Sequence, residues 1–346
     1  MNKLSKFIVH RGEFLLAMTG ATIGKIGKYI DEKPAYVNQR VLKFKDVGLV
    51  YYPYLYYFLS TEVFHSYIFN HIDSQSAQPN ISSNTIGKYA VRVPSLKTQQ
   101  QIAAILSSLD DKIDCNRRIN DNLLHQSNAL FKSFFIDFEP FREDELTETE
   151  LGLIPKNWKI LSFGDFIVAL TEKAPVDSLP EYSVTNNGII PRDTKFNKKL
   201  SKSSSMNKVL RKYNLVFGMS REILNWGIME DEIGGVSSAY NIYKIDEDLV
   251  DPTYLRLYIK AKVAEFNSLI GTAAREGQSL DKGQLMQKKI YVPTKNVLQD
   301  FFTRYCPYME TIHNAEQESR RLSQLRDALL PRLMSGELKV NEIEMP

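Results

Sequence analysis

An internal repeat of about 200 residues is the feature that most restricts how this chain can fold. The stretch GEFLLAMT at 12–19 resembles YNLVFGMS at 213–220, an offset of 201 residues. VRVPS at 91–95 parallels IYVPT at 290–294, an offset of 199 residues. Solenoid repeats have much shorter periods, of about 20–50 residues. We therefore expect a duplicated globular domain with its connector.

Two long helices are expected at equivalent places of the repeat. Apolar residues follow each other at spacings that alternate between four and three, which is the heptad pattern of a coiled coil. Each helix could pack only on its own domain, but two such helices favour an antiparallel pair. The expected apolar seam consists of Ile102, Leu106, Leu109, Ile113, Leu123, Leu130 and Phe134 in the first helix, and Phe301, Tyr305, Tyr308, Ile312, Leu322, Leu329 and Leu333 in the second.

Several residues interrupt this apolar seam. Asn116, Asn120 and Ser319 are polar and would help to fix the register at some cost in stability. Arg326 is charged, and Pro307 should either kink the second helix or mark its true start.

The composition excludes several classes of protein. With 25% charged and 43% hydrophobic residues, the chain is an ordinary globular protein. It holds no apolar run near the roughly 20 residues that span a bilayer, and Arg11 and Glu13 interrupt the start where a signal peptide would be apolar. Cys115 and Cys306 cannot form a disulfide framework or a four-ligand zinc site. We expect a cytoplasmic protein without membrane contact.

The two globular segments, 1–96 and 153–295, should each mix helices and strands. Residues 50–72 and 251–270 carry aromatic and aliphatic stripes at helical spacing, which we interpret as core and not as surfaces for base stacking. Short strand-like runs alternate with turn signals. These runs are FLLAM at 14–18, RVLKF at 40–44, YAVRV at 89–93, NLVFGM at 214–219, YNIYKI at 240–245 and KKIYV at 288–292.

Positive charge is concentrated in two regions. Residues 1–96 carry 11 Lys and Arg against 6 Asp and Glu. Residues 194–221 hold basic residues interleaved with Ser and Asn and contain no acidic residue. Lys and Arg neutralise phosphates and release counterions, so this pattern favours a nucleic-acid contact over an ordinary solvated loop.

Two polar loops precede the repeated Val-Pro motif, at 74–89 and 271–289. Gln and Asn can read adenine, and Arg can read guanine. Ser82 and Asp281 stand where helix N-caps would stand, and we interpret these two as caps.

Catalytic motifs are absent from the sequence. There is no P-loop, dinucleotide fingerprint, nucleophile elbow or zinc-protease motif, and the five histidines do not cluster at metal-binding spacing. GATIGKIGK at 20–28 has its glycines at the wrong spacing for a phosphate loop, so we expect a turn between strands. We expect that the chain alone catalyses no reaction and binds no metal.

Five segments together resemble one known family. LGLIPKNWKI at 151–160, MTGATIGKIG at 18–27 and QPNISSNTIGKYAVRVPS at 78–95 are similar to motifs at the start, middle and end of its target-recognition domains. QQQIAAILSSLDDKID at 99–114 and RLSQLRDALLPRLMSGEL at 321–338 resemble its conserved helices. The family is the DNA-specificity (S) subunit of type I restriction-modification systems.

This resemblance implies an α+β fold with two mixed α/β target-recognition domains separated by two long helices that form an antiparallel coiled coil. Each recognition domain would read one half of a split target in double-stranded DNA. The chain would bind no cofactor itself. Two modification (methyltransferase) subunits would dock on the helices and methylate adenine with S-adenosylmethionine, and restriction subunits would join them with ATP and Mg.

The expected organisation follows from the repeat and the resemblance. It is a first recognition domain at 1–96, spacer helices at 97–137 and 296–335, an exposed acidic linker at 138–152, a second recognition domain at 153–295, and a tail at 336–346. The first repeat has about a dozen residues before GEFLLAMT, so roughly 50 residues of the first domain would be missing by comparison with the second. The alternative function is a truncated or silent copy that binds modification subunits and reads only one half-site.

The candidate site residues are of two kinds. DNA contacts are expected from Lys25, Lys28, Arg40, Gln78, Asn80, Lys88, Lys195, Lys198, Lys199, Lys202, Arg221, Arg275, Gln278 and Lys282. The helices would dock partner subunits around Ile102, Leu109, Ile113, Leu123, Leu130, Ile312, Leu322 and Leu329.

Overall fold

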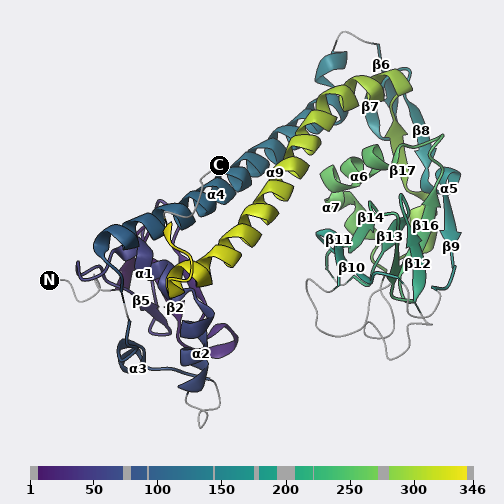
Figure 1. The fold of residues 1–346 in the computed structure, drawn as a ribbon. Helices are drawn as coiled ribbons and strands as arrows, with labels where there is room; N and C mark the ends of the chain where they lie inside the picture. Colours follow the sequence, from purple (N-terminus) through teal and green to yellow (C-terminus); the bar gives the residue numbers. More distant parts are fainter. Residues whose placement is uncertain are drawn as a thin grey trace. The chain divides into compact units, whose positions relative to one another are not determined.

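The chain forms two compact units in a computed structural model (Figure 1). Unit 1 consists of Met1–Asn122 with Thr311–Pro346, and unit 2 is Leu123–Glu310. Each long helix is divided between the units, so each unit contains part of both. The structure describes residues 7–72, 79–91, 93–142, 145–174, 179–192, 207–220, 222–271 and 280–340.

Unit 1 combines two small antiparallel sheets with three short helices beside the long ones. The sheets have the orders β3-β2-β5 and β1-β4. Phe14 and Leu16 of β2 pack against Phe64 and Ile68 of α2, and all four side chains are buried. The elements are β1 (Ile8–Val9), β2 (Phe14–Ala17), η2 (Gly20–Thr22), β3 (Ile26–Lys28), β4 (Ala35–Tyr36), β5 (Val41–Lys43), α1 (Tyr52–Leu59), α2 (Glu62–Asn70) and α3 (Ser83–Gly87).

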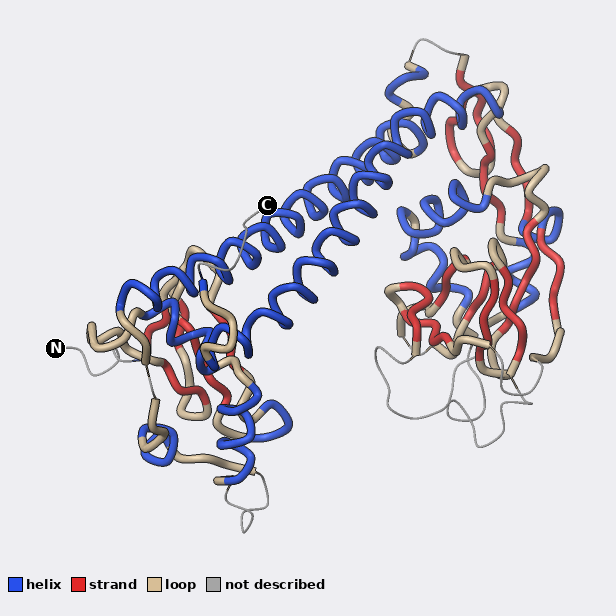
Figure 2. The backbone as a smooth tube through the Cα atoms, in the orientation of Figure 1, coloured by secondary structure: helices blue, strands red, loops and turns tan. Residues whose placement is uncertain are grey.

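Unit 2 is built around a four-stranded antiparallel sheet of order β14-β13-β16-β9 (Figure 2). Two-stranded sheets β12-β15, β10-β11, β17-β8 and β6-β7 accompany it. Its elements are β6 (Leu146–Thr149), β7 (Gly152–Pro155), β8 (Lys159–Ser162), α5 (Phe163–Phe166), β9 (Ile167–Leu170), β10 (Tyr182–Thr185), β11 (Gly188–Pro191), β12 (Lys208–Arg211), β13 (Leu215–Phe217), β14 (Trp226–Ile228), β15 (Ile233–Val236), β16 (Asn241–Ile245), α6 (Pro252–Ala261), α7 (Val263–Phe266), η5 (Asn267–Leu269), α8 (Lys282–Gln287) and β17 (Lys289–Val292).

The structure repeats as the sequence does. Strands β1 to β5 correspond in order and pairing to β12 to β16, because β3-β2-β5 matches β14-β13-β16 and β1-β4 matches β12-β15. Helices α1, α2 and α3 correspond to α6, α7 and α8. The mixed α/β character expected of both domains is confirmed. The aromatic stripes are core, as predicted, and each expected helix is broken into two shorter ones.

The long helices α4 (Leu96–Phe135) and α9 (Lys295–Ser335) pack against each other in antiparallel fashion within each unit. In unit 1, Ile102 and Leu106 share a buried cluster with Leu333. In unit 2, the ring of Phe301 lies 4.9 Å from that of Phe135. The predicted coiled coil is thereby confirmed, and every predicted seam position is buried or half-buried.

Polar seam residues find partners across the helix pair of unit 1. The Asn116 side-chain amide donates to Glu318 Oε2 at 2.7 Å. Arg326, which interrupts the apolar pattern, donates to Asp110 Oδ1 at 2.7 Å. The hydroxyl of Tyr57 on α1 donates to Asp110 Oδ2 at 2.6 Å, so one carboxylate joins three helices.

The two seam asparagines should respond oppositely to replacement by leucine. The buried Oδ1 of Asn120 accepts no hydrogen bond from the described residues, whereas Asn116 is bonded across the pair. Since an unpaired buried polar atom is costly, Asn120→Leu should raise the free energy of unfolding by about 1 kcal/mol. Asn116→Leu should lower it, because Glu318 loses one of its two donors and keeps only Lys112. Urea denaturation of both variants checks this, and equal shifts of the same sign would contradict it.

Two sequence predictions differ from the structure, and a third is narrowed. Helix α9 is continuous from Lys295, so Pro307 does not mark its start, and the kink at Pro307 stays a prediction. The expected linker at 138–152 is largely exposed but contains β6, which pairs with β7 in a hairpin. Of the expected strand at 89–93, the described residues Tyr89–Val91 and Val93 belong to no strand.

The helix caps are as predicted. The Ser82 side chain accepts from the backbone N–H of Thr85, and Asp281 accepts from that of Gln284. Within the part of the chain that the structure describes, no helix is long and apolar enough to cross a membrane.

Candidate nucleic-acid interface

In unit 1, predicted DNA-contacting residues gather at one end of the three-stranded sheet. The backbone N–H of Ala17 donates to the carbonyl of Lys25 at 2.9 Å, and that of Met18 donates to the carbonyl of Arg40 at 2.9 Å. The end of β2 therefore fixes Lys25 on one side and Arg40 on the other. Both residues are exposed.

Two motifs that lie 60 residues apart in the sequence meet at the same place. Thr19 forms an antiparallel bridge with Asn80, the N–H of Gly20 donates to the carbonyl of Pro79 at 3.0 Å, and that of Ile81 donates to Met18 at 3.0 Å. The backbone of Gly20 is left-handed, with φ of 74°, which glycine adopts at low cost. Lys25, Arg40 and the exposed Asn80 thus form a polar rim.

Lys28 and Lys88 lie apart from this rim along the chain. Lys88 is exposed and follows α3 as its C-cap. Lys28 is at the opposite end of β3, with its ammonium 4.4 Å from the centre of the Tyr56 ring. Burial lowers the pKa of Lys28, and the charges of Asp110 and Asp111 act in the other direction. This environment favours a packing role for Lys28.

In unit 2, the backbone brings three lysines from distant segments near one another. Lys173 and Lys208 are paired through their backbones in an antiparallel bridge, and the N–H of Ala174 donates to the carbonyl of Asn207 at 2.7 Å. Burial lowers the pKa of Lys208, and the nearby charge of Lys282 lowers it further. Such a concentration of positive charge suits a phosphate backbone. Lys173 was not predicted, because a single lysine beside Glu172 carries no signal in the sequence.

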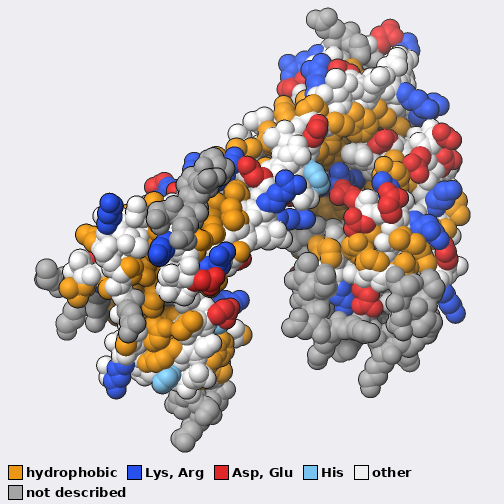
Figure 3. Space-filling model, viewed as in Figure 1, with side chains coloured by type: hydrophobic (Ala, Val, Ile, Leu, Met, Phe, Trp, Pro, Cys, Tyr) orange, Lys and Arg blue, Asp and Glu red, His pale blue; other side chains and the backbone are white. Residues whose placement is uncertain are grey.

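The other predicted contacts lie outside the described residues. They are Gln78, Lys195, Lys198, Lys199, Lys202, Arg221, Arg275 and Gln278. The described residues that flank two of these segments, Asn207–Lys208 and Leu280–Lys282, contribute to the lysine cluster. On the face drawn in Figure 3, acidic and basic side chains lie side by side over the rest of unit 2.

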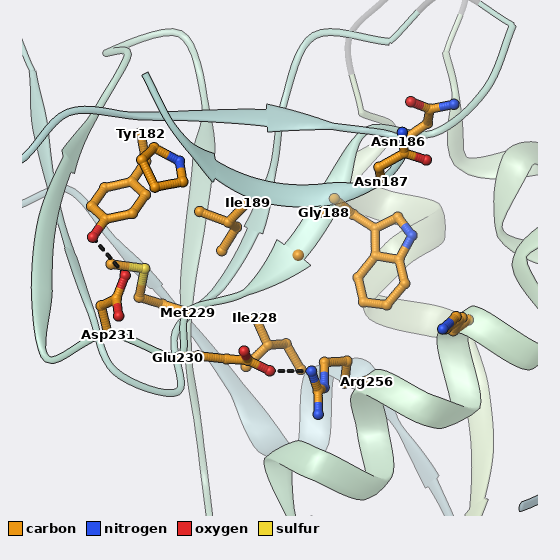
Figure 4. A pocket seen from close by; sticks show the side chains of 14 residues that line it. Tyr182, Asn186, Asn187, Gly188, Ile189, Ile228, Met229, Glu230, Asp231 and Arg256 are labelled. Atoms are coloured by element: carbon orange, nitrogen blue, oxygen red, sulfur yellow. Dashed lines mark hydrogen bonds and ion pairs between the residues drawn. The ribbon is translucent and has the colours of Figure 1, made fainter. Parts of the chain in front are cut away.

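Unit 2 also contains a cavity of about 460 Å³ that sequence reasoning missed. The β10-β11 hairpin, β14 and α6 line it (Figure 4). The hairpin lies close over β14, since a Cβ on Gly227 would be 2.6 Å from Ile189. The turn residues Asn186-Asn187-Gly188 are a typical hairpin signal and could have located it.

Both carboxylates that line this cavity have partners. Glu230 forms an ion pair with Arg256, and the Tyr182 hydroxyl donates to Asp231 at 2.6 Å. With both carboxylates engaged, the arrangement suits binding better than proton transfer. The described residues hold no group of three His, Cys, Asp or Glu that could bind a metal, and Cys115 and Cys306 are exposed free thiols.

The predicted docking residues of the helices lie mainly in the seam. Ile102 and Ile312 are buried, and the other six are half-buried. Their side chains serve the pairing of α4 with α9, so a partner would instead meet the outer faces. Exposed apolar residues there are Ile119, Leu124 and Leu325.

Comparison with known proteins shows what the chain is similar to. Residues 1–125 match the family model described as type I restriction modification DNA specificity domain. The chain is 27% identical over 348 residues to the type I restriction enzyme MjaIX specificity subunit of Methanocaldococcus jannaschii, an alignment that covers 97% of this chain and 80% of that protein. Along most of its length, the chain resembles the specificity subunits of type I restriction-modification systems.

Further similarity agrees with this resemblance. The chain is similar to the type I restriction enzyme HindI specificity subunit of Haemophilus influenzae, at 20% identity, over 75% of this chain and 71% of that protein. Its fold is that of the crystallised S subunit from M. genitalium, with a TM-score of 0.52 at 15% identity, over 95% of this chain and 84% of the other.

Proposed function

We propose that this chain is a specificity subunit that binds double-stranded DNA, reads a bipartite target, and directs adenine methylation or restriction by partner subunits. The main observation in support of this proposal is the duplicated fold. Two units share one order of strands and helices, and each includes its own part of the helix pair. Two reading domains in one chain multiply specificity, because the second contact becomes intramolecular.

The chain would supply recognition, and its partners would supply chemistry. Two modification subunits would bring S-adenosylmethionine, and restriction subunits would bring ATP and Mg. The surface of this chain contributes lysine and arginine for phosphates, and Asn80 for a base edge or a phosphate. It would take no part in a bond-breaking step, and its cellular place would be the cytoplasm.

Footprinting with the purified modification subunit tests the proposal. We expect two separated protected half-sites, and an affinity that falls with salt at a slope of about −0.9 per phosphate contact. The absence of a sequence-selective complex at low salt would exclude DNA reading by this chain.

A second candidate is a scaffold that binds modification subunits and reads one half-site only. The described residues of unit 1 hold no counterpart of β8, α5 and β9, and this observation favours it. The same footprint distinguishes the two, because protection of a single half-site would support the scaffold.

Substitutions in the lysine cluster (Lys173, Lys208 and Lys282) and in the polar rim should have different effects on DNA binding. Lys208→Gln and Lys282→Gln should weaken binding to all DNA sequences alike and reduce the salt slope by about 1 per lost phosphate contact. Asn80→Ala should change which sequence is preferred. Binding titrations at several salt concentrations check this, with Lys132→Gln on the exposed face of α4 as the control. A selectivity change in the lysine variants, or none in Asn80→Ala, would contradict this division.

A further inference from the structure

The cavity of unit 2 has an apolar floor and a polar rim. Trp226, Ile228 and Met229, on and beside β14, line it and are at most 7% exposed. The turn residues Asn186 and Asn187 line its rim and are exposed. Small-molecule sites are typically concave and apolar with a few polar groups, and they measure about 300–1,000 Å³. At about 460 Å³, the cavity has both the form and the size of such a site.

Trp226 gives this cavity an aromatic surface. The other tryptophan of the chain, Trp158, lies 5.4–5.7 Å from the rings of Phe138, Phe141 and Tyr291. Trp226 meets no aromatic ring of the described residues, and its indole N–H donates to no acceptor among them. This N–H is not sealed from solvent, since the only fully buried unpaired side-chain atom that the described residues contain is Asn120 Oδ1. Because a buried indole N–H usually has a partner, Trp226 is suited to a ligand.

Two cations on one face of α6 border the same cavity. Arg256 and Lys260 are four residues apart, about one helical turn, and both line it. Glu230 pairs with Nη1 of Arg256 alone, so Nε and Nη2 have no partner among the described residues. The Lys260 ammonium is exposed and likewise unpaired within the described part of the chain. Guanidinium and ammonium donors of this kind suit a phosphate.

The repeat indicates that the shared fold does not require Arg256. Pro53 and Pro252 stand in the first turns of α1 and α6, at an offset of 199 residues. The same offset places Tyr57 at the position of Arg256. Tyr57 is buried, and its hydroxyl donates to Asp110 on α4. Unit 1 thus uses this position for packing, whereas unit 2 places a cation with free donors at a cavity.

Carboxylate oxygens add acceptors to these donors. Asp231 uses Oδ2 for the Tyr182 hydroxyl, and Glu230 uses Oε1 for Arg256. The second oxygen of each carboxylate has no donor among the described residues. In Figure 4, Ile189 of the hairpin lies on one side of the cavity, and Glu230 and Arg256 lie on the other. A ligand between them meets acceptors and donors together, and exocyclic amino groups of bases donate to such carboxylates.

We propose that this cavity binds one nucleotide, with its base against Trp226 and its phosphate at Arg256 and Lys260. An exocyclic amino group of the base donates to the free oxygen of Glu230 or Asp231. A nucleotide combines the flat ring, the edge donor and the anion that these side chains select together. Its source is either a free nucleotide or an unstacked nucleotide of a strand, because a base that stays paired in a duplex cannot enter a cavity.

Tryptophan fluorescence of the full chain tests this proposal. Trp158→Phe leaves Trp226 as the only indole. We expect dAMP and dCMP to change its emission in a saturable manner. The corresponding nucleosides should bind at least about tenfold more weakly, because they lack the charged hydrogen bonds of the phosphate. Calorimetry on the unaltered chain repeats the titrations, so a disturbance of the aromatic cluster by Trp158→Phe leaves the test intact.

Lys260→Gln separates contact with the ligand from a structural role. It should weaken binding of dAMP and dCMP by about fivefold and leave binding of the nucleosides unchanged, because only the phosphate loses a partner. Lys244→Gln is the matched control. It removes an exposed lysine of β16 that does not line the cavity, and it should change neither affinity. Equal weakening of nucleotide and nucleoside in Lys260→Gln would overturn the proposal.

Competition distinguishes the two sources of the nucleotide. Displacement of dCMP by a single-stranded oligonucleotide would assign the cavity to a nucleotide of a strand, and binding of dCMP without such displacement would assign it to a free nucleotide. No saturable binding of either nucleotide overturns the proposal, as does tighter binding of free phenylalanine, whose ring carries an ammonium and a carboxylate instead. Footprinting of duplex half-sites reports contacts in the grooves and needs no cavity, so the proposed function stands or falls separately.

Discussion

Phe301→Ala should lower the free energy of unfolding of unit 2 by about 3–5 kcal/mol, because it empties a fully buried aromatic position. The ring of Phe301 lies between 4.9 and 5.9 Å from those of Phe131, Phe134 and Phe135 on α4, and 5.2 Å from that of Tyr305. The substitution removes the contact that attaches the start of α9 to the end of α4.

Chemical denaturation followed by circular dichroism measures this effect. Cys306→Ala on the same helix is the control, since its side chain is exposed and should change the midpoint little. A loss below about 1 kcal/mol for Phe301→Ala would show that the site collapses around the missing ring and that the aromatic cluster does not hold the helices together.

Asp110→Ala should have the second largest effect, a loss of about 2–3 kcal/mol in the stability of unit 1. The carboxylate accepts hydrogen bonds from both Arg326 and Tyr57. Its removal leaves the hydroxyl of the buried Tyr57 without this acceptor and leaves Arg326 with Asp327 alone. A fully buried pair broken in this way loses about 3–5 kcal/mol, and partial exposure of both side chains reduces the value.

A double-mutant comparison separates pairing from packing. Asp110→Leu with Arg326→Leu should recover most of the stability lost in Asp110→Ala, since apolar side chains of similar size suit a helix seam. Thermal denaturation of the single and double variants provides the measurement. If the double variant is no more stable than Asp110→Ala, Tyr57 rather than Arg326 is the partner that matters.

The heptad spacing predicted the long helices well because it depends on local sequence, and the repeat predicted that the two units share one order of elements. The seam from Ile102 to Phe134 could be predicted from residue spacing, and the caps Ser82 and Asp281 from residue type. The failure at 89–93 has a different origin. A strand forms only where a partner is available, and the pattern of Tyr89–Val93 carries no information about the partner.

The candidate site was only partly predictable for the same reason. Composition indicated the basic segments, but the meeting of Lys173 with Lys208 depends on pairing between distant strands. Lys28 has the same charge as Lys25, yet it packs on Tyr56 because it lies at the other end of β3. Charge density in a sequence predicts a surface, and the fold decides which lysines reach it.

The discontinuity of unit 1 has a consequence for synthesis on the ribosome. Unit 2 is one uninterrupted stretch, Leu123–Glu310, whereas unit 1 needs residues from both ends of the chain. Ile102 and Leu106 cannot pack against Leu333 until it has been translated, more than 220 residues later. At about 5–20 residues per second, that delay lasts tens of seconds at the slow end of the range. During it, unit 2 can fold while the apolar stripe of α4 in unit 1 stays open to chaperones, so the first domain to begin synthesis is the last to be completed.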